Sequence, residues 1–244
     1  MFVRQLRING YRSIRNIELE LGQLNVICGP NGCGKSNLYK AVKLLHEASQ
    51  GQLAAVLAEE GGIQKTLWAG KKRSGESRMN LSATLEDFDY ELQVGFENSP
   101  GPGSSIFTLD PWVKAESLWM TGHQRRPSSR LVDASLGRFQ MMMQREGIYR
   151  PLEASELSDG TLRFVCLAVA ILSPRPPSFM AFNEPENSLH PDLIPALAML
   201  LAETSRYSQL WITSHSPELA ELIRQHAVVQ CFELAQRQGE TQLA

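Results

Sequence analysis

The sequence predicts an α/β fold in which a mixed sheet is flanked by helices, and three observations lead to this prediction. The first residues alternate between apolar and polar side chains, as antiparallel strands with one buried face do. A glycine-rich loop at residues 29–36 lies between an apolar run and a helical pattern. Two more short apolar runs, residues 179–182 and 210–213, are separated by a helical pattern at residues 192–203, which is typical of parallel strands.

The N-terminal segment predicts two strands, followed by a third strand and a helix. Residues 3–8 and 16–21 alternate, and a turn at residues 9–10 (Asn-Gly) is predicted to join them. Residues 24–28 form a continuous apolar run that ends at a Gly-Pro turn, as a buried strand does. Residues 37–45 place apolar side chains at helical spacing directly after the glycine-rich loop.

The glycine-rich loop fits the pattern G-x-x-x-x-G-K-[ST] of a P-loop at every fixed position. Its glycines allow successive N–H groups to point inward at an anion, and the following helix adds its positive end. Lys35 would bind the β and γ phosphates of a nucleotide, and the Ser36 hydroxyl would be a ligand of Mg²⁺. The residues predicted to surround the phosphates are Asn31, Gly32, Cys33, Gly34, Lys35, Ser36 and Asn37.

Composition and charge limit the range of functions. With 244 residues, 43% of them hydrophobic and 20% charged, the chain can form one large domain or two small lobes. The four cysteines have no metal-ligand spacing, and no apolar run approaches the length of a membrane span. We expect reduced thiols and a cytoplasmic protein without a membrane partner.

The net charge of -2 excludes a chain that is basic throughout, so contact with DNA would need local basic patches. Such charge runs are more often solvated surface than binding sites. The candidate patches are Arg4, Arg7, Arg12 and Arg15, residues 71–73, and Arg125, Arg126 and Arg130.

The middle of the chain is less regular. Residues 50–69 have mixed patterns, and residues 79–85 and 89–96 predict an antiparallel pair of strands. Residues 98–105 are rich in proline and glycine and predict a loop. Residues 111–136 show no strong period.

Three polar turns in the second half border apolar elements. Ser158 is placed to cap a helix over residues 162–172, and alone it indicates no more than a helix start. Glu184 follows a predicted strand, where it could polarise an attacking water or belong to a solvated loop. His215 follows the next predicted strand, where it could reach a γ phosphate or be a structural turn residue.

These pieces, in this order, resemble the ABC-type ATPase heads of the RecF/SMC-like group, particularly the stand-alone ATPases related to RecF and to the ATPase parts of OLD-family nucleases. The resemblance covers residues 1–45 and 153–244, and its most specific part is the opening at residues 6–38 (LRINGYRSIRNIELELGQLNVICGPNGCGKSNL). It implies a P-loop NTPase fold of the ABC-ATPase type with antiparallel N-terminal strands and a small second lobe.

The resemblance implies one ABC-type ATPase domain over residues 1–244. Residues 1–48 and 151–244 would form the nucleotide-binding core. Residues 49–150 would form a variable inserted lobe that is shortened or incomplete in this chain.

Roles for the polar turns also follow from the resemblance. Residues 157–161 would be the signature motif, and residues 179–184 would be the Walker B strand with Glu184 as the catalytic glutamate. Residues 188–191 would be the D-loop, and His215 would be the switch histidine.

The mechanism implied by the resemblance is a homodimer that encloses two ATP molecules. The P-loop of one copy would face Ser158 and Gly160 of the other, so that ATP favours closure and hydrolysis favours opening. Ser36 and Asn183 are expected to hold Mg²⁺. Lys35, Glu184 and His215 are expected to take part in catalysis.

Three departures from the family pattern bear on function. Asn183 stands where such ATPases usually carry an aspartate near Mg²⁺, and the missing charge is worth roughly a few kcal/mol. We therefore expect weak Mg²⁺ binding and slow turnover, with hydrolysis retained through Glu184. No sustained heptad pattern is present, which favours a compact RecF-like head over a true SMC protein. Gln64 and Gln93 are the candidates for the glutamine that usually links the two lobes.

Three functional classes fit these features. The first is a slow ATPase whose dimerisation is coupled to DNA repair or to defence against phage, with DNA as a candidate partner. The second is a nearly inactive module in which ATP controls an associated effector nuclease or toxin, and Asn183 motivates it. The third is the ATPase subunit of an importer or exporter, a class whose signature usually reads nearer to LSGGQ than residues 157–161 do.

Overall fold

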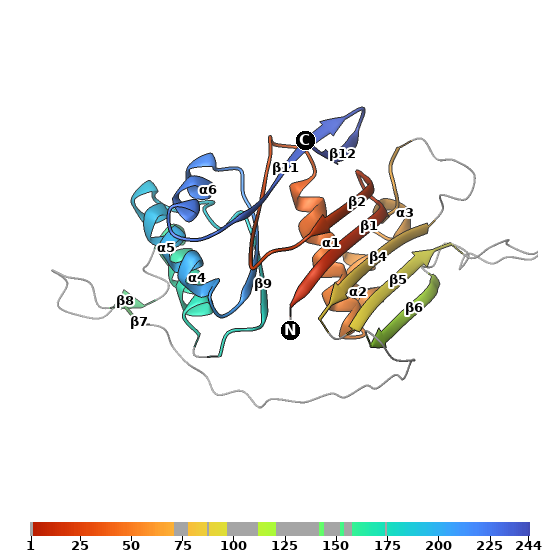
Figure 1. Cartoon of the computed structure of the whole chain (residues 1–244), viewed down its shortest axis with the longest axis horizontal. Coiled ribbons are helices and arrows are strands. Elements are labelled where there is room, and N and C mark those ends of the chain that lie inside the picture. Colours follow the sequence, from red (N-terminus) through yellow and green to blue (C-terminus); the bar gives the residue numbers. More distant parts are fainter. Residues whose placement is uncertain are drawn as a thin grey trace, which may run out of the picture.

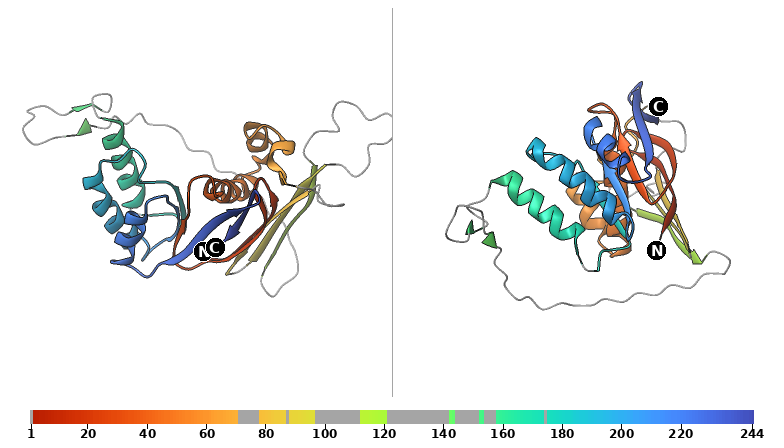
Figure 2. Two further views of the ribbon diagram at one scale, coloured as in Figure 1. Left: turned by 90° about the horizontal axis from the view of Figure 1, so that it is seen from above. Right: turned by 60° about the vertical axis from the view of Figure 1, so that its left-hand side comes forward.

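The computed structural model describes residues 2–70, 78–86, 88–96, 112–120, 142–143, 152–153, 158–173 and 175–244. Only the backbone is described for residues 112–120, 142–143 and 152–153. Two five-stranded sheets organise these residues. Helix α1 (Lys35–Ser49) packs between the two sheets. Helices α4 (Asp159–Ile171), α5 (Ile194–Thr204) and α6 (Pro217–Arg224) lie together on the other side of the second sheet, as Figure 1 and Figure 2 show.

The first sheet is antiparallel throughout and has the strand order β2-β1-β4-β5-β6. Its strands are β1 (Val3–Tyr11), β2 (Ile14–Glu20), β4 (Arg78–Leu85), β5 (Phe88–Gly95) and β6 (Trp112–Met120). The predicted pairing of residues 79–85 with 89–96 is confirmed as the β4–β5 ladder. Strand β6 lies in a stretch where the sequence shows no strong period. The strand is defined by its antiparallel pairing with β5, a contact that the local sequence pattern does not reveal.

The predicted turn at residues 9–10 is wrong, because β1 continues through both residues to Tyr11. The chain turns at residues 12–13 instead, where β1 meets β2. Gly10 has a φ of 73°, and a Cβ there would lie 2.6 Å from the carbonyl oxygen of Arg78 in β4. This glycine therefore serves the close approach of two strands rather than a turn.

The second sheet has the strand order β12-β11-β3-β10-β9. Its strands are β3 (Leu24–Cys28), β9 (Phe179–Asn183), β10 (Gln209–Thr213), β11 (Gln230–Arg237) and β12 (Glu240–Leu243). The ladders of β11, β3, β10 and β9 are parallel, whereas β12 pairs antiparallel with β11. Because β3, β10 and β9 are parallel neighbours, the loops that follow them meet at one edge of the sheet.

One hydrophobic core surrounds α1 between the two sheets. Leu38 and Leu44 of the helix are fully buried and belong to one cluster with Ile8 of β1 and Trp211 of β10. Helices α2 (Leu53–Glu59) and α3 (Ile63–Thr66) add to this cluster. Each such buried side chain contributes about 1.5–3 kcal/mol, so this packing holds the loop before α1 in a fixed place.

A second core lies on the opposite face of the second sheet. Val26 and Ile212 of the sheet cluster there with Leu201 of α5 and Leu219 of α6. The helices predicted after Ser158 and over residues 192–203 are confirmed as α4 and as α5, which a 3₁₀ turn η3 (Pro191–Leu193) precedes. The observed architecture is the predicted mixed sheet with flanking helices and antiparallel N-terminal strands. A short ladder of β7 (Met142–Met143) with β8 (Leu152–Glu153) accompanies it.

Several predicted features lie outside the described residues, namely the loop at residues 98–105, the basic patches at 71–73 and at Arg125, Arg126 and Arg130, and Leu157. The division of the chain at residues 48 and 151 and the choice of the linking glutamine stay predictions. In the part of the chain that is described, no helix has the length and apolar character needed to cross a membrane.

Candidate functional site

The glycine-rich loop connects the carboxyl end of β3 to the first turn of α1. Gly29, Gly32 and Gly34 have φ angles of 148°, 81° and 107°, which residues with a Cβ rarely adopt. A Cβ at Gly34 would overlap the side chain of Thr241 in β12, whereas a Cβ at Gly32 would meet no atom within 4 Å. The loop therefore packs against β12 at Gly34, whereas the space next to Gly32 is open among the described residues and could admit a phosphate.

Lys35 is the first residue of α1 and is only 4% exposed. Its Nζ donates hydrogen bonds to the carbonyl oxygens of Gly29 at 2.6 Å and Pro30 at 3.0 Å. Charged phosphate oxygens are stronger acceptors than these carbonyls. Among the described residues no side chain caps α1, so the first N–H groups of this helix could bind an anion. The predicted phosphate-binding role of Lys35 fits this geometry.

A group of hydrogen bonds behind the loop joins three separate elements. Ser13 Oγ and Thr241 Oγ1 are 2.7 Å apart, and Asn37 Nδ2 donates to Ser13 Oγ at 2.7 Å. The backbone N–H of Thr241 donates to the carbonyl oxygen of Ser13 at 2.8 Å. These hydrogen bonds connect the β1–β2 turn and β12 to α1. The side chain of Asn37 makes one of them, the bond to Ser13. Sequence reasoning missed Ser13 and Thr241, because their proximity depends on the pairing of distant strands.

The turn after β9 is fixed to the end of β10. The N–H of Glu184 donates to the carbonyl oxygen of Thr213 at 2.8 Å, and Thr213 Oγ1 donates to Asn183 Oδ1 at 2.8 Å. Asn187 Nδ2 donates to Glu184 Oε2 at 2.6 Å. Glu184 has a φ of 48°, a left-handed conformation that costs a residue with a side chain about 1–2 kcal/mol. The surrounding hydrogen bonds maintain this conformation, as is common at functional sites.

His215 follows β10 and is held by a second glutamate of the same turn. Glu186 Oε1 accepts hydrogen bonds from Ser214 Oγ at 2.6 Å and from the N–H of His215 at 3.1 Å. The same oxygen lies 3.3 Å from His215 Nδ1. The sequence prediction gave a role to Glu184 and none to Glu186, although both belong to the acidic turn after the strand.

The predicted signature residues form a separate group. Ser158 caps α4, and its Oγ accepts a backbone N–H of the first helical turn at 3.3 Å. A Cβ at Gly160 would overlap the carbonyl oxygen of Ser188, so the start of α4 packs closely against the predicted D-loop. Arg163 Nη2 donates to the carbonyl oxygen of Glu184 at 3.0 Å. The start of α4 is thereby connected to the turn that carries the predicted catalytic glutamate.

The sheet brings the other predicted groups together. The P-loop with Lys35 follows β3, His215 follows β10, and Asn183 and Glu184 lie at the end of β9. Since β10 pairs with both β3 and β9, these groups are neighbours at the carboxyl edge of the sheet. This edge is the usual place for ligands in α/β proteins with parallel strands.

The oxygen donors at this edge fit Mg²⁺ bound together with a triphosphate. Ser36 is exposed at the start of α1, and Asn183 Oδ1 lies at the end of β9. Within the described ranges, no group of three His, Cys, Asp or Glu side chains forms a metal site. Mg²⁺ usually has one or two carboxylate ligands besides phosphates and water, so with two neutral protein oxygens the phosphates would supply most of the charge that binds the ion.

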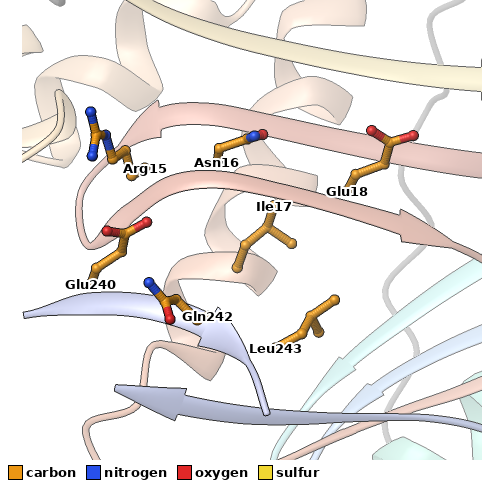
Figure 3. A pocket seen from close by; sticks show the side chains of 7 residues that line it. All are labelled: Arg15, Asn16, Ile17, Glu18, Glu240, Gln242 and Leu243. Atoms are coloured by element: carbon orange, nitrogen blue, oxygen red, sulfur yellow. The ribbon is translucent and has the colours of Figure 1, made fainter. Parts of the chain in front are cut away.

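A separate cavity of about 450 Å³ lies between β2 and β12 (Figure 3). Its lining consists of Arg15, Asn16, Ile17, Glu18, Glu240, Gln242 and Leu243. None of the residues predicted to bind nucleotide or metal lines it, so it is not part of the site at the carboxyl edge.

Comparisons with known proteins agree with this geometry. Residues 1–94 match a family model described as an AAA ATPase domain. Residues 114–221 match an AAA domain model that is named for the AbiEii toxin of a type IV TA system. The phosphonates import ATP-binding protein PhnC of Lactobacillus delbrueckii subsp. bulgaricus is 27% identical over 185 residues, which are 75% of this chain. The chain spans 65% of the length of that relative.

Two solved structures share the fold over the whole chain. The SMC head domain with an extended coiled coil from Pyrococcus furiosus, bound to the C-terminal domain of ScpA, has a TM-score of 0.69 and 11% identity. The match covers 100% of this chain and 96% of the Pyrococcus furiosus chain. The SMC head domain from Thermotoga maritima has a TM-score of 0.59 and 15% identity, and covers 100% of this chain and 98% of its own.

Proposed function

We propose that this chain, which shares its fold with SMC head domains and matches an AAA ATPase domain model over residues 1–94, binds ATP and hydrolyses it slowly in a homodimer that closes around two ATP molecules. The observation that supports the proposal most is the carboxyl edge of the second sheet. There the loops after β3, β10 and β9 carry Lys35, His215 and Glu184 as neighbours. We assign the nucleotide-binding core to residues 1–48 and 151–244 and the inserted lobe to residues 49–150.

The proposed chemistry is positional and electrostatic. Lys35 and the N–H groups of the P-loop bind the β and γ phosphates. Glu184 orients the attacking water and accepts its proton, and His215 contacts the γ phosphate. Ser36 and Asn183 would hold Mg²⁺ together with the phosphates, and the bound ion would supply positive charge that offsets the charge of the transferred group.

Closure of the dimer depends on Ser158 and Gly160 of the second copy. Ser158 is exposed at the N-terminus of α4, a helix of 13 residues, so its surroundings can accept an anion from another molecule. A γ phosphate would contact both copies, whereas ADP has no group to reach the second copy. ATP therefore favours the closed dimer, and hydrolysis favours opening.

Coupling of this cycle to DNA repair or to defence against phage is the preferred biological role. The AbiEii-named model over residues 114–221 supports the defence role. Two of the N-terminal arginines have acidic partners, since Arg7 pairs with Glu18 at 3.2 Å and Arg12 with Glu60 at 2.9 Å. Gel shifts with double-stranded DNA at several salt concentrations test the coupling, because phosphate contacts weaken steeply as salt rises. Absence of a shift at low salt would remove DNA as a direct partner.

A nearly inactive, ATP-gated regulator of an effector nuclease or toxin is the second candidate, and Asn183 favours it. Thr213 already donates to the Asn183 side-chain oxygen, and no negative charge stands at this position. Hydrolysis at background level, measured on a protein that still binds ATP, would favour this regulator over the slow ATPase.

An importer subunit is the least supported role, and the phosphonates import relative is the reason to test it. Co-purification with a membrane permease would favour that role.

A further inference from the structure

Glu186 is a buried carboxylate whose environment is unusual. It is 7% exposed, and one of its oxygens, Oε1, receives all of its hydrogen bonds. Its other oxygen, Oε2, is buried without a hydrogen-bond partner among the described residues. An unsatisfied buried polar atom costs about 1–3 kcal/mol, more for a charged group. Bonds to Ser214 and to the His215 backbone account for Oε1 but leave Oε2 unpaired among the described residues.

The contacts of Glu186 are concentrated on the loop after β10. Besides Ser214 Oγ and the N–H of His215, Oε1 lies 3.3 Å from His215 Nδ1. The side chain of His215 is 40% exposed, so Nδ1 lies beside the carboxylate while part of the ring remains accessible. Glu184, in contrast, has its Oε2 bonded to Asn187 of its own turn. The carboxylate that contacts the histidine is therefore not the one predicted to act on water.

We propose that Glu186 is the positioning residue of His215: its Oε1 accepts a hydrogen bond from Nδ1–H and fixes the imidazole ring, and Nε2 is the nitrogen left for the phosphate, to which it donates once it also carries a proton. This inference rests on the proposed function for the identity of the phosphate as that of ATP. A carboxylate that accepts from one ring nitrogen determines which tautomer is present. The bond also connects the turn after β9 to the turn after β10, so that the positions of Glu184 and His215 are fixed relative to each other.

The tautomer of His215 can be measured directly. Long-range ¹H–¹⁵N correlation spectra of the full-length protein at a pH of about 8, where free histidine is neutral, distinguish Nδ1–H from Nε2–H. The chain contains five histidines, and a His215→Asn variant identifies the signals of this residue. We expect the Nδ1–H form in the wild-type protein. A wild-type spectrum with the Nε2–H form at His215 would overturn the proposal, and this result does not depend on hydrolysis or on any variant of Glu186.

Substitutions of Glu186 separate positioning from simple support. Glu186→Met keeps the length of the side chain but removes both acceptors, and we expect His215 to change to the Nε2–H form. Glu186→Gln keeps an acceptor, and we expect it to retain the Nδ1–H form. Glu221→Met is the matched control, because Glu221 is an exposed carboxylate of α6 that pairs with Arg224. An unchanged His215 spectrum in Glu186→Met would contradict the proposal.

Kinetics of the same variants complete the test. We expect Glu186→Met to lower kcat roughly 10- to 100-fold while the affinity for ADP stays within about twofold, and Glu186→Gln to restore most of the rate. A rate unchanged in Glu186→Met would overturn the positioning role. If the wild-type protein shows no hydrolysis, the proposed ATPase function fails, and the NMR result still decides whether Glu186 positions His215.

Discussion

Replacing Gly34 by alanine should destabilise the protein more than the same change at Gly32, and the difference can be worked from the structure. Both glycines have a positive φ, 107° at Gly34 and 81° at Gly32. A Cβ at Gly34 would also overlap Thr241, whose nearest atoms are Oγ1 and Cγ2, whereas a Cβ at Gly32 would meet nothing within 4 Å. Thr241 is fully buried, so it has little room to move away.

The two contributions have different sizes. A left-handed backbone costs an alanine roughly 1–2 kcal/mol at either position. Overlap with a packed side chain adds about 1–3 kcal/mol at Gly34. We therefore expect Gly34→Ala to lower the free energy of unfolding by about 2–5 kcal/mol and Gly32→Ala by about 1–2 kcal/mol. The effect of alanine on the unfolded chain is shared by both variants and cancels in their difference.

Urea denaturation of both variants, and of each in a Thr241→Ala background, measures these terms. Thr241→Ala alone should cost about 1 kcal/mol through its lost bond to Ser13. In that background the cost of Gly34→Ala should fall toward that of Gly32→Ala, whereas the cost of Gly32→Ala should not change. Equal costs for the two glycines in the wild-type background would refute the reasoning, as would a Gly34 cost that does not depend on residue 241.

Two further predictions concern the nucleotide site, and a third concerns the accessibility of the cysteines. Asn183→Asp restores a charge next to Mg²⁺, so steady-state hydrolysis at limiting Mg²⁺ should rise, and a flat rate would show that Asn183 does not limit turnover. Lys35→Met removes a charged donor to the phosphates, so ATP affinity measured by calorimetry should fall about 10- to 100-fold, and an unchanged affinity would contradict the P-loop assignment. Alkylation followed by mass spectrometry should modify the exposed Cys166 and Cys231 before the buried Cys33, and early modification of Cys33 would contradict the observed burial.

The parts of the fold that the sequence predicts are those whose signal is local. The P-loop is read from eight consecutive residues, and β9 and β10 are short apolar runs with polar ends. Because parallel strands end at the same edge, the neighbourhood of Glu184 and His215 follows once the two strands are recognised. The helix cap at Ser158 is likewise a local pattern, and the structure confirms it.

The parts that the sequence does not predict depend on contacts between distant segments. Gly10 reads as a turn residue, and only its approach to Arg78 in β4 shows that it belongs to a continuous strand. The support of Gly34 by Thr241 joins residues from the two ends of the chain. The role of Glu186 depends on the pairing of β9 with β10, which brings the acidic turn beside His215.

If ATP holds two copies of this chain together, the mass of a hydrolysis-deficient variant should double when ATP is bound. Glu184→Gln keeps the size of the side chain but removes the carboxylate that orients water, so bound ATP should persist. In analytical ultracentrifugation we expect twice the monomer mass for this variant with ATP and Mg²⁺, and the monomer mass with ADP. A monomer mass in saturating ATP and Mg²⁺ would contradict it.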